Sequence, residues 1–306
     1  MENAPNPVAS LSLMSPMALQ EGVASLSRGA YFKEASLDMT LSILTESAAR
    51  MSGVERVSIW ALTDDQQELR CLELFELTPG LHSRGDVISA RQYPVYFQAL
   101  RSENCIAADD SYRHPGTAEF AADYLPRHGI CASLDTTIHI RGELQGVLCL
   151  EQVGSRQPWS AAHRLFAHAV ANLVTLALVE YEAGEARQQG VDAKERLKAV
   201  FDASRDALLL ADGESGLILD ANRQAETLFG CTRKELVGKH QQQLHPLSDE
   251  AKVADLFRHV VAGQMTSAQV AEIQRCDGSV RPVEITTEVA DLSDGRRLAL
   301  GIFRPI

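Results

Sequence analysis

The chain has 306 residues, of which 45% are apolar and 23% are charged, and its mean hydropathy is −0.11. These values are typical of soluble globular proteins and exclude a disordered, collagenous or membrane-embedded chain. The length predicts about two domains, each large enough to close a hydrophobic core. The net charge of −12 argues against a surface that binds the phosphates of nucleic acid.

The N-terminal segment and the cysteines indicate the cellular compartment. Residues 1–31 mix Pro, Ser, Ala and Gly without a sustained period, so we expect a flexible tail that runs into a helix. This segment lacks the features of a secretory signal, and the longest apolar run, 173–181, is too short to cross a membrane. The cysteines form no CxxC pair and no zinc-ligand spacing, which is typical of a reducing compartment. We therefore expect a cytoplasmic protein without membrane contact.

The first block of regular structure, 32–181, predicts helices packed on an antiparallel sheet. Apolar residues at steps of three and four indicate helices, and alternating apolar and polar residues indicate strands. Gly53 lies where a glycine would end the first of these helices. The expected helices are 34–51, 93–101, 117–125 and a long one after Ser160, and the expected strands are 56–62, 69–77, 105–108, 132–140 and 144–152.

The second block, 201–306, repeats this organisation on a smaller scale. Short helices are expected over 222–244 and a longer helix over 249–262, and the expected strands are 207–211, 217–221, 266–274, 280–288 and 297–303. The segment 182–200 predicts a helical linker, because the last helix of the first block does not stop at the block's edge. The fold class is therefore α+β, with two domains that each have an antiparallel sheet with flanking helices, joined by a long helix.

The second block resembles a PAS domain over about 196–306. The likeness lies in the run VFDASRDALLLADGESGLILDANRQAETLFGCTRKELVGKHQQQLHP, in RCDGSVRPVEI and in the ending LALGIFRPI. Asn222 after a strand suits a helix cap, and Asp277-Gly278 suits a hairpin turn. The residues in the family's order are Asp220, Asn222, Ala225, Leu228, Phe229, Gly230, Leu236, Gly238, Asp277 and Gly278.

The first block resembles a GAF domain. Its marks are the helix before VSIWAL, the segment DDSYRHPGTAEFAADYLPRHGICASLDTTI, the pair GELQGVLCLE and the closing helix PWSAAHRLFAHAVANLVTLALVEYE. Together the two blocks resemble the sensory front end of a bacterial histidine kinase, diguanylate cyclase or cyclic-di-GMP phosphodiesterase. The chain has no HExxxP, GGDEF or EAL stretch and stops at Ile306, so this resemblance implies a C-terminal output domain or a partner protein.

The cofactors of these two families require particular residues, and none of their signatures is found. No NCRFLQ-like stretch supplies a flavin cysteine, and Cys131 is followed by Ala132 rather than by the histidine of bilin-binding domains. Val253 stands where the haem-binding relatives have their iron-ligand histidine, although His259 follows two turns later. We expect no haem, flavin or bilin. We also expect no metal, because His163 and His168, like His240 and His245, are five residues apart rather than three or four.

The resemblance to a GAF domain implies a ligand cavity between the sheet of the first block and the layer that covers it. In the GAF-like block, aromatic, acidic and basic side chains suit a small polar ligand of unknown identity. The alternative is that the aromatic residues only pack on the sheet and the charges lie in a solvated loop. The candidate ligand residues are Trp60, Phe75, Tyr93, Phe97, Asp109, Tyr112, Arg113 and Cys131.

The PAS-like block offers an apolar set that is expected to point inward. At these spacings the set forms a core first of all, and a ligand site only if space remains. The inward set is Leu208, Leu210, Phe229, Phe257, Val261, Ile273, Val283, Ile285, Leu300 and Ile302. The candidate ligand residues are Leu210, Asn222, Phe229, Phe257, Ile273, Ile285 and Ile302.

The linker carries an apolar seam at steps of three and four, which predicts a parallel coiled coil and a homodimer. Gly184 and Gly190 weaken its centre, each by about 1 kcal/mol relative to Ala. A plain amphipathic connector is the alternative. The seam consists of Leu176, Val179, Ala183, Ala186, Gly190, Ala193, Leu197 and Val200.

These features predict a sensory module without catalytic residues, in which a bound signal shifts the linker helices and biases an output of the two-component or cyclic-di-GMP type. Two alternatives stay open. Some GAF-fold proteins reduce free methionine sulfoxide with pocket cysteines, and Cys71, Cys105 and Cys131 lie in the first block. The chain can also be a dimerisation platform that binds no ligand.

Overall fold

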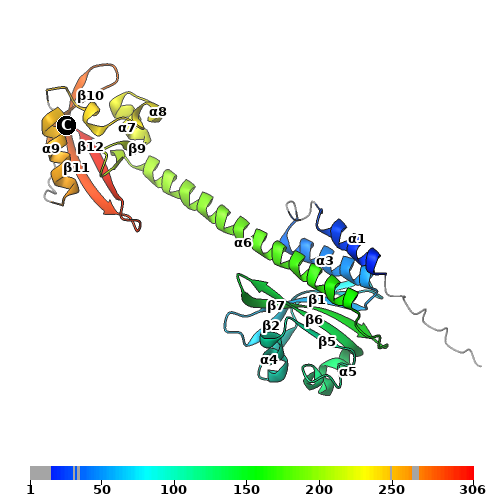
Figure 1. Cartoon of the computed structure of the whole chain (residues 1–306). Helices are drawn as coiled ribbons and strands as arrows, with labels where there is room; N and C mark the ends of the chain where they lie inside the picture. Colours follow the sequence, from blue (N-terminus) through cyan, green and yellow to red (C-terminus); the bar gives the residue numbers. More distant parts are fainter. Residues whose placement is uncertain (1–14, 30–31, 33–34, 249, 264–268) are drawn as a thin grey trace, which may run out of the picture. The chain divides into compact units, whose positions relative to one another are not determined.

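The computed structural model describes residues 15–306 except 30–31, 33–34, 249 and 264–268. The structure divides into two compact units, Met1–Ala186 and Arg187–Ile306. Within each unit, helices flank an antiparallel sheet, and the helix α6, Ala161–Ala203, begins in the first unit and ends in the second (Figure 1). The predicted α+β fold class is confirmed. Of the predicted N-terminal tail, residues 1–14 and 30–31 lie outside the described residues.

The first unit has one sheet with the strand order β3-β2-β1-β7-β6-β5, and β4 also pairs with β2. The short edge strands β3 and β4 were not predicted. The strands are β1 Arg56–Leu62, β2 Glu68–Glu76, β3 Leu81–Ser83, β4 Val87–Ser89, β5 Cys105–Ala108, β6 Ile130–Ile140 and β7 Glu143–Val153. The described helices, besides α6, are α1 Pro16–Leu26, α3 Leu37–Ser52, α4 Pro94–Ser102, the 3₁₀ helix η1 Ala118–Ala122 and α5 Tyr124–His128.

Helices cover both faces of this sheet. The helices α3 and α6 pack on one face, and α4 and α5 lie over the other (Figure 1). The Ser36 side chain accepts a hydrogen bond from the Met39 N–H at the start of α3, and Gly53 ends α3 with φ 69°, as its position predicts. The buried side of α3 includes Leu41 and Leu44, and burial of each leucine contributes about 1.5–3 kcal/mol.

The hairpin β6–β7 separates apolar side chains from polar ones. Leu134 and Leu150 belong to the core beside α3 and α6. Asp135 pairs with Cys149 across the two strands, and Ser133 pairs with Glu151. Because successive residues of a strand point to opposite faces, these four side chains lie on the face covered by α4 and α5.

The second unit has a five-stranded sheet with the order β10-β11-β12-β8-β9. Its strands are β8 Ala207–Asp212, β9 Ile218–Ala221, β10 Gln269–Gln274, β11 Val280–Asp291 and β12 Arg297–Pro305. The described helices inserted between β9 and β10 are α7 Arg223–Phe229, α8 Arg233–Leu236, the 3₁₀ helix η2 Gln241–Leu244 and α9 Glu250–Val261. The predicted start of the third strand at Thr266, and of the last helix at Asp249, lies outside the described residues.

The predicted inward side of two strands in this unit is wrong. Leu209 and Phe303 are buried and belong to the core, whereas Leu210 and Ile302 are only half-buried and lie on the opposite face of the sheet, as do Leu208 and Leu300. The strand β8 reads ALLLAD, and a continuous apolar run has no alternation that would distinguish its two faces. The cross-strand pairs Leu210↔Leu300 and Leu208↔Ile302 keep these four residues together on the outer face.

The cysteine spacing, interpreted as typical of a reducing compartment, gave no indication of a disulfide, yet the structure has one. Cys231 and Cys276 form a disulfide, with a Cα–Cα distance of 5.7 Å and a sequence separation of 45 residues. Cys231 follows α7 and Cys276 follows β10, so the chain fold and not the local spacing brings them together. The other cysteines, Cys71, Cys105, Cys131 and Cys149, are free thiols.

The helix α6 passes a length-and-composition test for a membrane span. Its most apolar 18-residue window has a mean hydropathy of 1.4, and 44% of that window is buried within the protein. The buried side chains lie between His163 and Ala177, in the part that packs on the first sheet. A core helix of a soluble protein passes the same test, so this finding is weak evidence for a membrane span.

Candidate ligand cavities

The first unit has a cavity between its sheet and the layer formed by α4, η1 and α5. Its volume is about 380 Å³, counted with the part that opens to solvent. Four aromatic residues form walls, and two carboxylates, a thiol and a serine contribute polar groups from β6 and β7. We call this space the first cavity; these residues are Trp60, Tyr96, Phe120, Tyr124, Asp135, Glu151, Cys149 and Ser133.

The carboxylates of the first cavity are deeply buried. Asp135 and Glu151 are 4% and 5% exposed. Burial, and then the charge of the nearby Glu151, together raise the pKa of Asp135 to about 7, although hydrogen bonds from Cys149 and Tyr96 act in the opposite direction. Burial also raises the pKa of Glu151, against the lowering effect of Arg56. Asp135 therefore changes its protonation state near neutral pH.

Arg56 on β1 is the cationic side chain that pairs with one of these two carboxylates, Glu151. Its Nε donates to Glu151 at 2.9 Å, and its Nη1 donates to Glu76. Burial opposes the charged guanidinium, but the attraction of Glu151 and Glu76 outweighs it and holds the pKa of Arg56 above its ordinary value. Breaking such a buried pair by removing one partner costs about 3–5 kcal/mol. The pair anchors Glu151, while Asp135 has neutral donors only.

The thiol and the phenols of the first cavity are neutral. Burial raises the pKa of Cys149 and of Tyr96 well above the ordinary values, and the hydroxyl of Tyr96 lies 3.9 Å from the Cys149 sulfur. Burial also raises the pKa of Tyr124, with Glu151 acting in the same direction. A thiol that does not ionise is a poor nucleophile, so the groups of this cavity are suited to binding.

The structure places some of the predicted first-unit residues at the cavity and others beside it. Trp60 lines the cavity. Tyr93 and Phe97 are buried in the same core but do not line it, and the Tyr93 hydroxyl donates to Asp123 at 2.8 Å. Phe75 lies on the opposite face, against the His82 ring at 4.7 Å and in the core beside α3.

The remaining predicted residues belong to the loop before η1 and to the start of β6. Asp109 accepts from the Trp159 N–H at 2.8 Å, and the Tyr112 ring contacts the Arg156 guanidinium at 5.9 Å. The Arg113 side chain is 88% exposed. Cys131, like these three residues, is not among the cavity-lining residues of the described chain. This loop therefore packs against the segment before α6.

The sequence reasoning missed Asp135 and Glu151, the most distinctive residues of the first cavity. A signal for them exists in the sequence. Asp135 is the only acidic residue of the strand ICASLDTTIHI, and Glu151 directly follows the apolar run VLCL in ELQGVLCLEQV. A charge at such a position is rarely fully buried without a partner, so it marks a candidate site.

The second unit has a larger cavity, of about 820 Å³ with its solvent-open part, which we call the second cavity. Its walls are mainly apolar and come from β8, β10–β12 and α9, and its polar residues are Gln241, His245, Gln269 and Thr287. The His245 Nδ1 lies 2.7 Å from the Glu272 carbonyl oxygen, which fixes the proton on that nitrogen. The Gln241 Nε2 is buried and has no hydrogen-bond partner among the described residues.

Two of the predicted second-unit residues, Phe257 and Ile285, line the second cavity. Phe229 and Ile273 are fully buried in the core and do not line it. Leu210 and Ile302 lie on the outer face, as described above. Val253 lines the cavity, whereas the His259 side chain is 46% exposed and lies 2.7 Å from the carbonyl oxygen of Asp255 on its own helix.

Asn222 does not line the second cavity, and its side chain instead forms hydrogen bonds to the backbone. Its Oδ1 accepts from the Leu208 and Ala225 N–H groups, both at 2.9 Å. Its Nδ2 donates to the carbonyl oxygens of Phe201 and Asp206, at 3.1 and 2.9 Å. The predicted cap of α7 is thus confirmed, and the same side chain also holds the last turn of α6.

The predicted seam residues on α6 are exposed. Every described residue over 179–200 is exposed, including Leu197 at 72% and Val200 at 68%. Within one chain, the side chains of this stretch are therefore largely open to solvent, although its first turns line a hollow together with described residues of the segment 32–40.

Comparisons with known proteins agree with this architecture. The family model of the GAF domain matches residues 36–178, and that of the PAS fold matches residues 195–306. Residues 36–178 therefore form a GAF domain, and residues 195–306 form a PAS domain that follows it. The first cavity is therefore the cavity of the GAF domain, and the second is that of the PAS domain.

Individual relatives are distant. An uncharacterised protein of Azorhizobium caulinodans is 26% identical over 190 residues, which cover 60% of this chain and 25% of that protein, so the chain spans about a quarter of that relative's length. A PAS domain from Colwellia psychrerythraea is 28% identical with a TM-score of 0.34 and covers 37% of this chain and 96% of its own. The GAF domain of a phosphoenolpyruvate-protein phosphotransferase from Coxiella burnetii is 15% identical with a TM-score of 0.46 and covers 56% and 99%.

Proposed function

We propose that this chain is the sensory region of a cytoplasmic signalling protein. A small molecule in the GAF or the PAS cavity changes the pairing of two α6 helices, one from each copy of a homodimer. That change biases the activity of an output domain or partner protein outside these residues. The output belongs to the histidine kinase, diguanylate cyclase or cyclic-di-GMP phosphodiesterase class, because tandem regions of this kind precede such domains.

The observation that carries this proposal is the exposed stretch of α6 over 179–200. An isolated helix of this length is marginal in water, since most helical stability in proteins comes from tertiary packing. Apolar residues repeat along one side of the stretch, and Gly184 and Gly190 weaken its centre. Pairing with a second copy would cover that side, while the weak centre would allow a small shift between the helices.

The thiols support a sensory rather than an enzymatic function. The reductase alternative needs reactive thiolates at the cavity, but Cys71, Cys105 and Cys131 are not among its described lining residues. Burial raises the pKa of Cys71 to about 12, with smaller contributions from Asp86 and Glu73, and burial raises the pKa of Cys105 as well. A higher pKa lowers the fraction of thiolate at neutral pH, and the thiolate is the nucleophile.

The walls of the PAS cavity indicate the ligand they would accept. Apolar side chains favour an apolar body, and the buried Gln241 Nε2 favours one hydrogen-bond acceptor on it. An unpaired buried donor costs about 1–3 kcal/mol, which a ligand acceptor would recover. The ligand class we propose for this cavity is an uncharged, mainly apolar molecule with a carbonyl or hydroxyl oxygen.

Native mass spectrometry of the purified full chain tests the proposal. Ala271→Phe fills the PAS cavity, whereas Val270→Phe places the same side chain at the neighbouring, 73% exposed position of β10. We expect a dimer with a bound small molecule for the wild type and for Val270→Phe, and loss of that molecule for Ala271→Phe. A dimer that never carries or binds a molecule in either cavity would favour the dimerisation platform instead. An absorbance spectrum of the same sample checks the expected absence of a chromophore.

A further inference from the structure

The GAF cavity combines a buried carboxylate with aromatic walls, and this combination points to a ligand of definite charge. The groups that face Asp135 are Tyr96 from α4, Tyr124 from α5, and Cys149 and Glu151 from β7. The first three are neutral, and Glu151 is anionic when it pairs with Arg56. Asp135 therefore has no cationic partner among the described residues of the cavity.

The charges around the cavity leave an excess of negative charge. Arg56 is shared by Glu151 and Glu76, so one guanidinium already serves two carboxylates. His128, whose ring contacts Tyr124 at 4.8 Å, supplies no compensating charge at neutral pH, because burial and then Arg56 lower its pKa. An ionised Asp135 therefore needs a cation from outside the chain, since buried charges are stable only when they are paired.

The aromatic walls favour an organic cation. Phe120 lies 4.8 Å from Tyr96 and 5.4 Å from Tyr124, measured between ring centroids, and Trp60 completes the wall from β1. The negative face of an aromatic ring attracts ammonium groups, and the attraction reaches about 2 kcal/mol when both partners are desolvated. The hydroxyl groups of Ser133 and Thr117 also line the cavity and can accept hydrogen bonds from N–H donors.

We propose that the GAF cavity binds the ammonium end of a small primary amine, with Asp135 as its counter-ion and Trp60, Tyr96 and Phe120 as its aromatic wall. This inference rests on the proposed sensory function, because it identifies the class of molecule that the GAF domain would detect. The alkyl part of the amine lies toward the open side of the cavity.

Proton linkage follows from this arrangement. The amine requires the ionised carboxylate, and burial raises the pKa of Asp135 to about 7. Below that pH the carboxyl group is protonated in the empty protein, so binding must first release its proton. Affinity therefore rises with pH up to about 7 and becomes nearly constant above it, with a slope of about tenfold per pH unit below pH 7.

Titration calorimetry on the full chain tests the proposal with ethylammonium chloride as the probe. Ethanol is the neutral control of similar size, and sodium chloride controls for ionic strength. We expect ethylammonium to bind and ethanol not to bind, and we expect Asp135→Asn to weaken binding at least tenfold at pH 8. Asp64→Asn removes the same charge from an exposed turn and leaves the affinity unchanged. Equal binding of ethanol, or full affinity in Asp135→Asn, would overturn the proposal.

A second measurement does not depend on the folding of Asp135→Asn. The chain has two tryptophans, so Trp159→Phe leaves Trp60 at the cavity as the sole tryptophan reporter. We expect ethylammonium to change its fluorescence, with an apparent affinity that increases between pH 5 and 7. An affinity independent of pH, or no fluorescence change at any pH, contradicts this inference. A molecule still retained by the PAS cavity in native mass spectra would leave the proposed function standing.

Discussion

The side-chain amide of Asn222 donates a hydrogen bond to the carbonyl oxygen of Phe201 at 3.1 Å, and thereby joins the last turn of α6 to the start of the PAS fold. The same amide nitrogen donates to Asp206, and the Oδ1 accepts from Leu208 at the start of β8. All these groups are near the point where α6 ends, at Ala203. A displacement of the helix end therefore has a direct route to the strand β8 of the PAS sheet.

Asn222→Ala removes this junction. Several backbone groups lose their partners, so we expect the PAS domain to lose about 2–4 kcal/mol of local stability. Hydrogen exchange of the amides over 207–212 measures the effect, which we expect as faster exchange by about 1.5 to 3 orders of magnitude. Asn222→Asp keeps the acceptor oxygen and should show an intermediate effect. An unchanged exchange rate in Asn222→Ala would show that these hydrogen bonds do not determine the local stability of β8.

The seam on α6 predicts the assembly state. Leu176→Glu/Val179→Glu places charges on the proposed contact of two helices, and we expect light scattering to show a weakened or dissociated dimer. Gln188→Glu/Gln189→Glu adds the same charge off the seam and should leave the dimer intact. A wild-type monomer at high micromolar concentration is incompatible with the predicted pairing.

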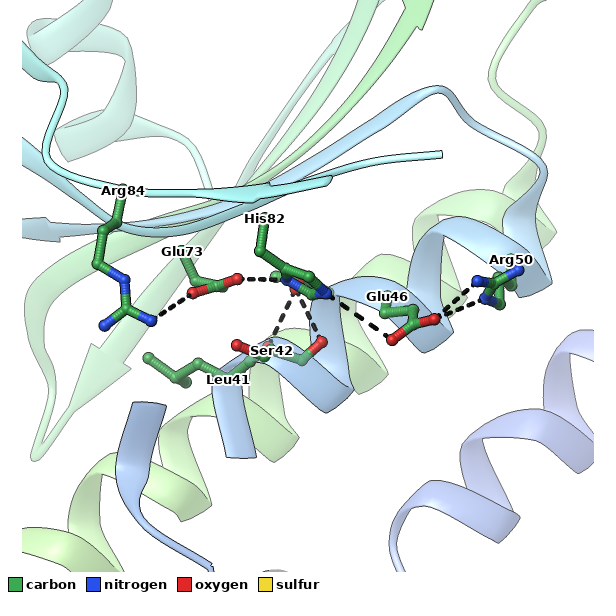
Figure 2. Close-up of polar contacts among 8 residues, drawn as sticks. Leu41, Ser42, Glu46, Arg50, Glu73, His82 and Arg84 are labelled. Atoms are coloured by element: carbon green, nitrogen blue, oxygen red, sulfur yellow. Dashed lines mark hydrogen bonds and ion pairs between the residues drawn. The ribbon is translucent and has the colours of Figure 1, made fainter. Parts of the chain in front are cut away.

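His82 holds a buried carboxylate against α3. Figure 2 shows the ring between Glu73 and Glu46, with Nδ1 at 2.6 Å from Glu73 and Nε2 at 3.8 Å from Glu46. Glu73 is fully buried, and its Oε2 has no hydrogen bond among the described groups but lies 3.4 Å from the Arg84 guanidinium. Two ion pairs, Glu46–His82 and Asp38–Arg84, also connect α3 to the end of the β2–β3 hairpin.

His82→Ala leaves the Glu73 carboxylate without its strongest hydrogen bond, and we expect a loss of about 1–3 kcal/mol in the GAF domain. Urea unfolding followed by tryptophan fluorescence measures it, because Trp60 and Trp159 both lie in this domain. His139→Ala, at an exposed position of β6, is the matched control. Equal midpoints for the two variants would refute this role.

Asp135 predicts how stability depends on pH in the absence of a ligand. Its folded pKa of about 7 lies above its ordinary value of 3.8, so the folded state binds the proton more tightly than the unfolded state. This contribution is fully present below about pH 4 and is lost as the pH rises through 7, by up to about 4 kcal/mol. The difference in unfolding free energy between wild type and Asp135→Asn, measured from pH 5 to 8, should follow this curve. A difference in unfolding free energy that does not change with pH would exclude this contribution of Asp135.

The disulfide between Cys231 and Cys276 closes a loop of 45 residues in the PAS domain. Such a cross-link stabilises the fold by about 2–4 kcal/mol in the chain-entropy account. We expect alkylation of the denatured, unreduced chain to modify four of its six cysteines, and all six after reduction. Intact-mass measurement counts the modified thiols. Six modified cysteines without reductant would show that the pair is reduced in the isolated protein.

Local patterns in the sequence were sufficient for most of the fold. The spacing of Leu41, Leu44 and Ala48 predicted α3, and the glycine after it predicted where that helix ends. Alternation predicted the β6–β7 hairpin, and Asn222 was correctly expected as a helix cap. These features depend on neighbours a few residues apart, so the sequence alone contains the information for them.

The candidate sites depended on contacts between distant segments. Phe75 and Trp60 look alike in a sequence, yet the pleat and a bulge in β2, at Leu72, place them on opposite faces of the sheet. Within ALLLAD no alternation of apolar and polar residues distinguishes Leu209 from Leu210. Leu209 is buried only because its face of the sheet is covered by a layer of other elements.

By itself, the sequence determined the two sensory domains, their order and the helix that continues between them, because hydrophobic period and turn chemistry are local properties. The tertiary structure alone decided that Asp135 shares a buried cavity with Glu151 and four aromatic side chains, and that Cys231 meets Cys276. Burial and charge pairing arise from segments that are far apart along the chain. Their effect on a carboxylate or a thiol therefore exists only after the chain has folded.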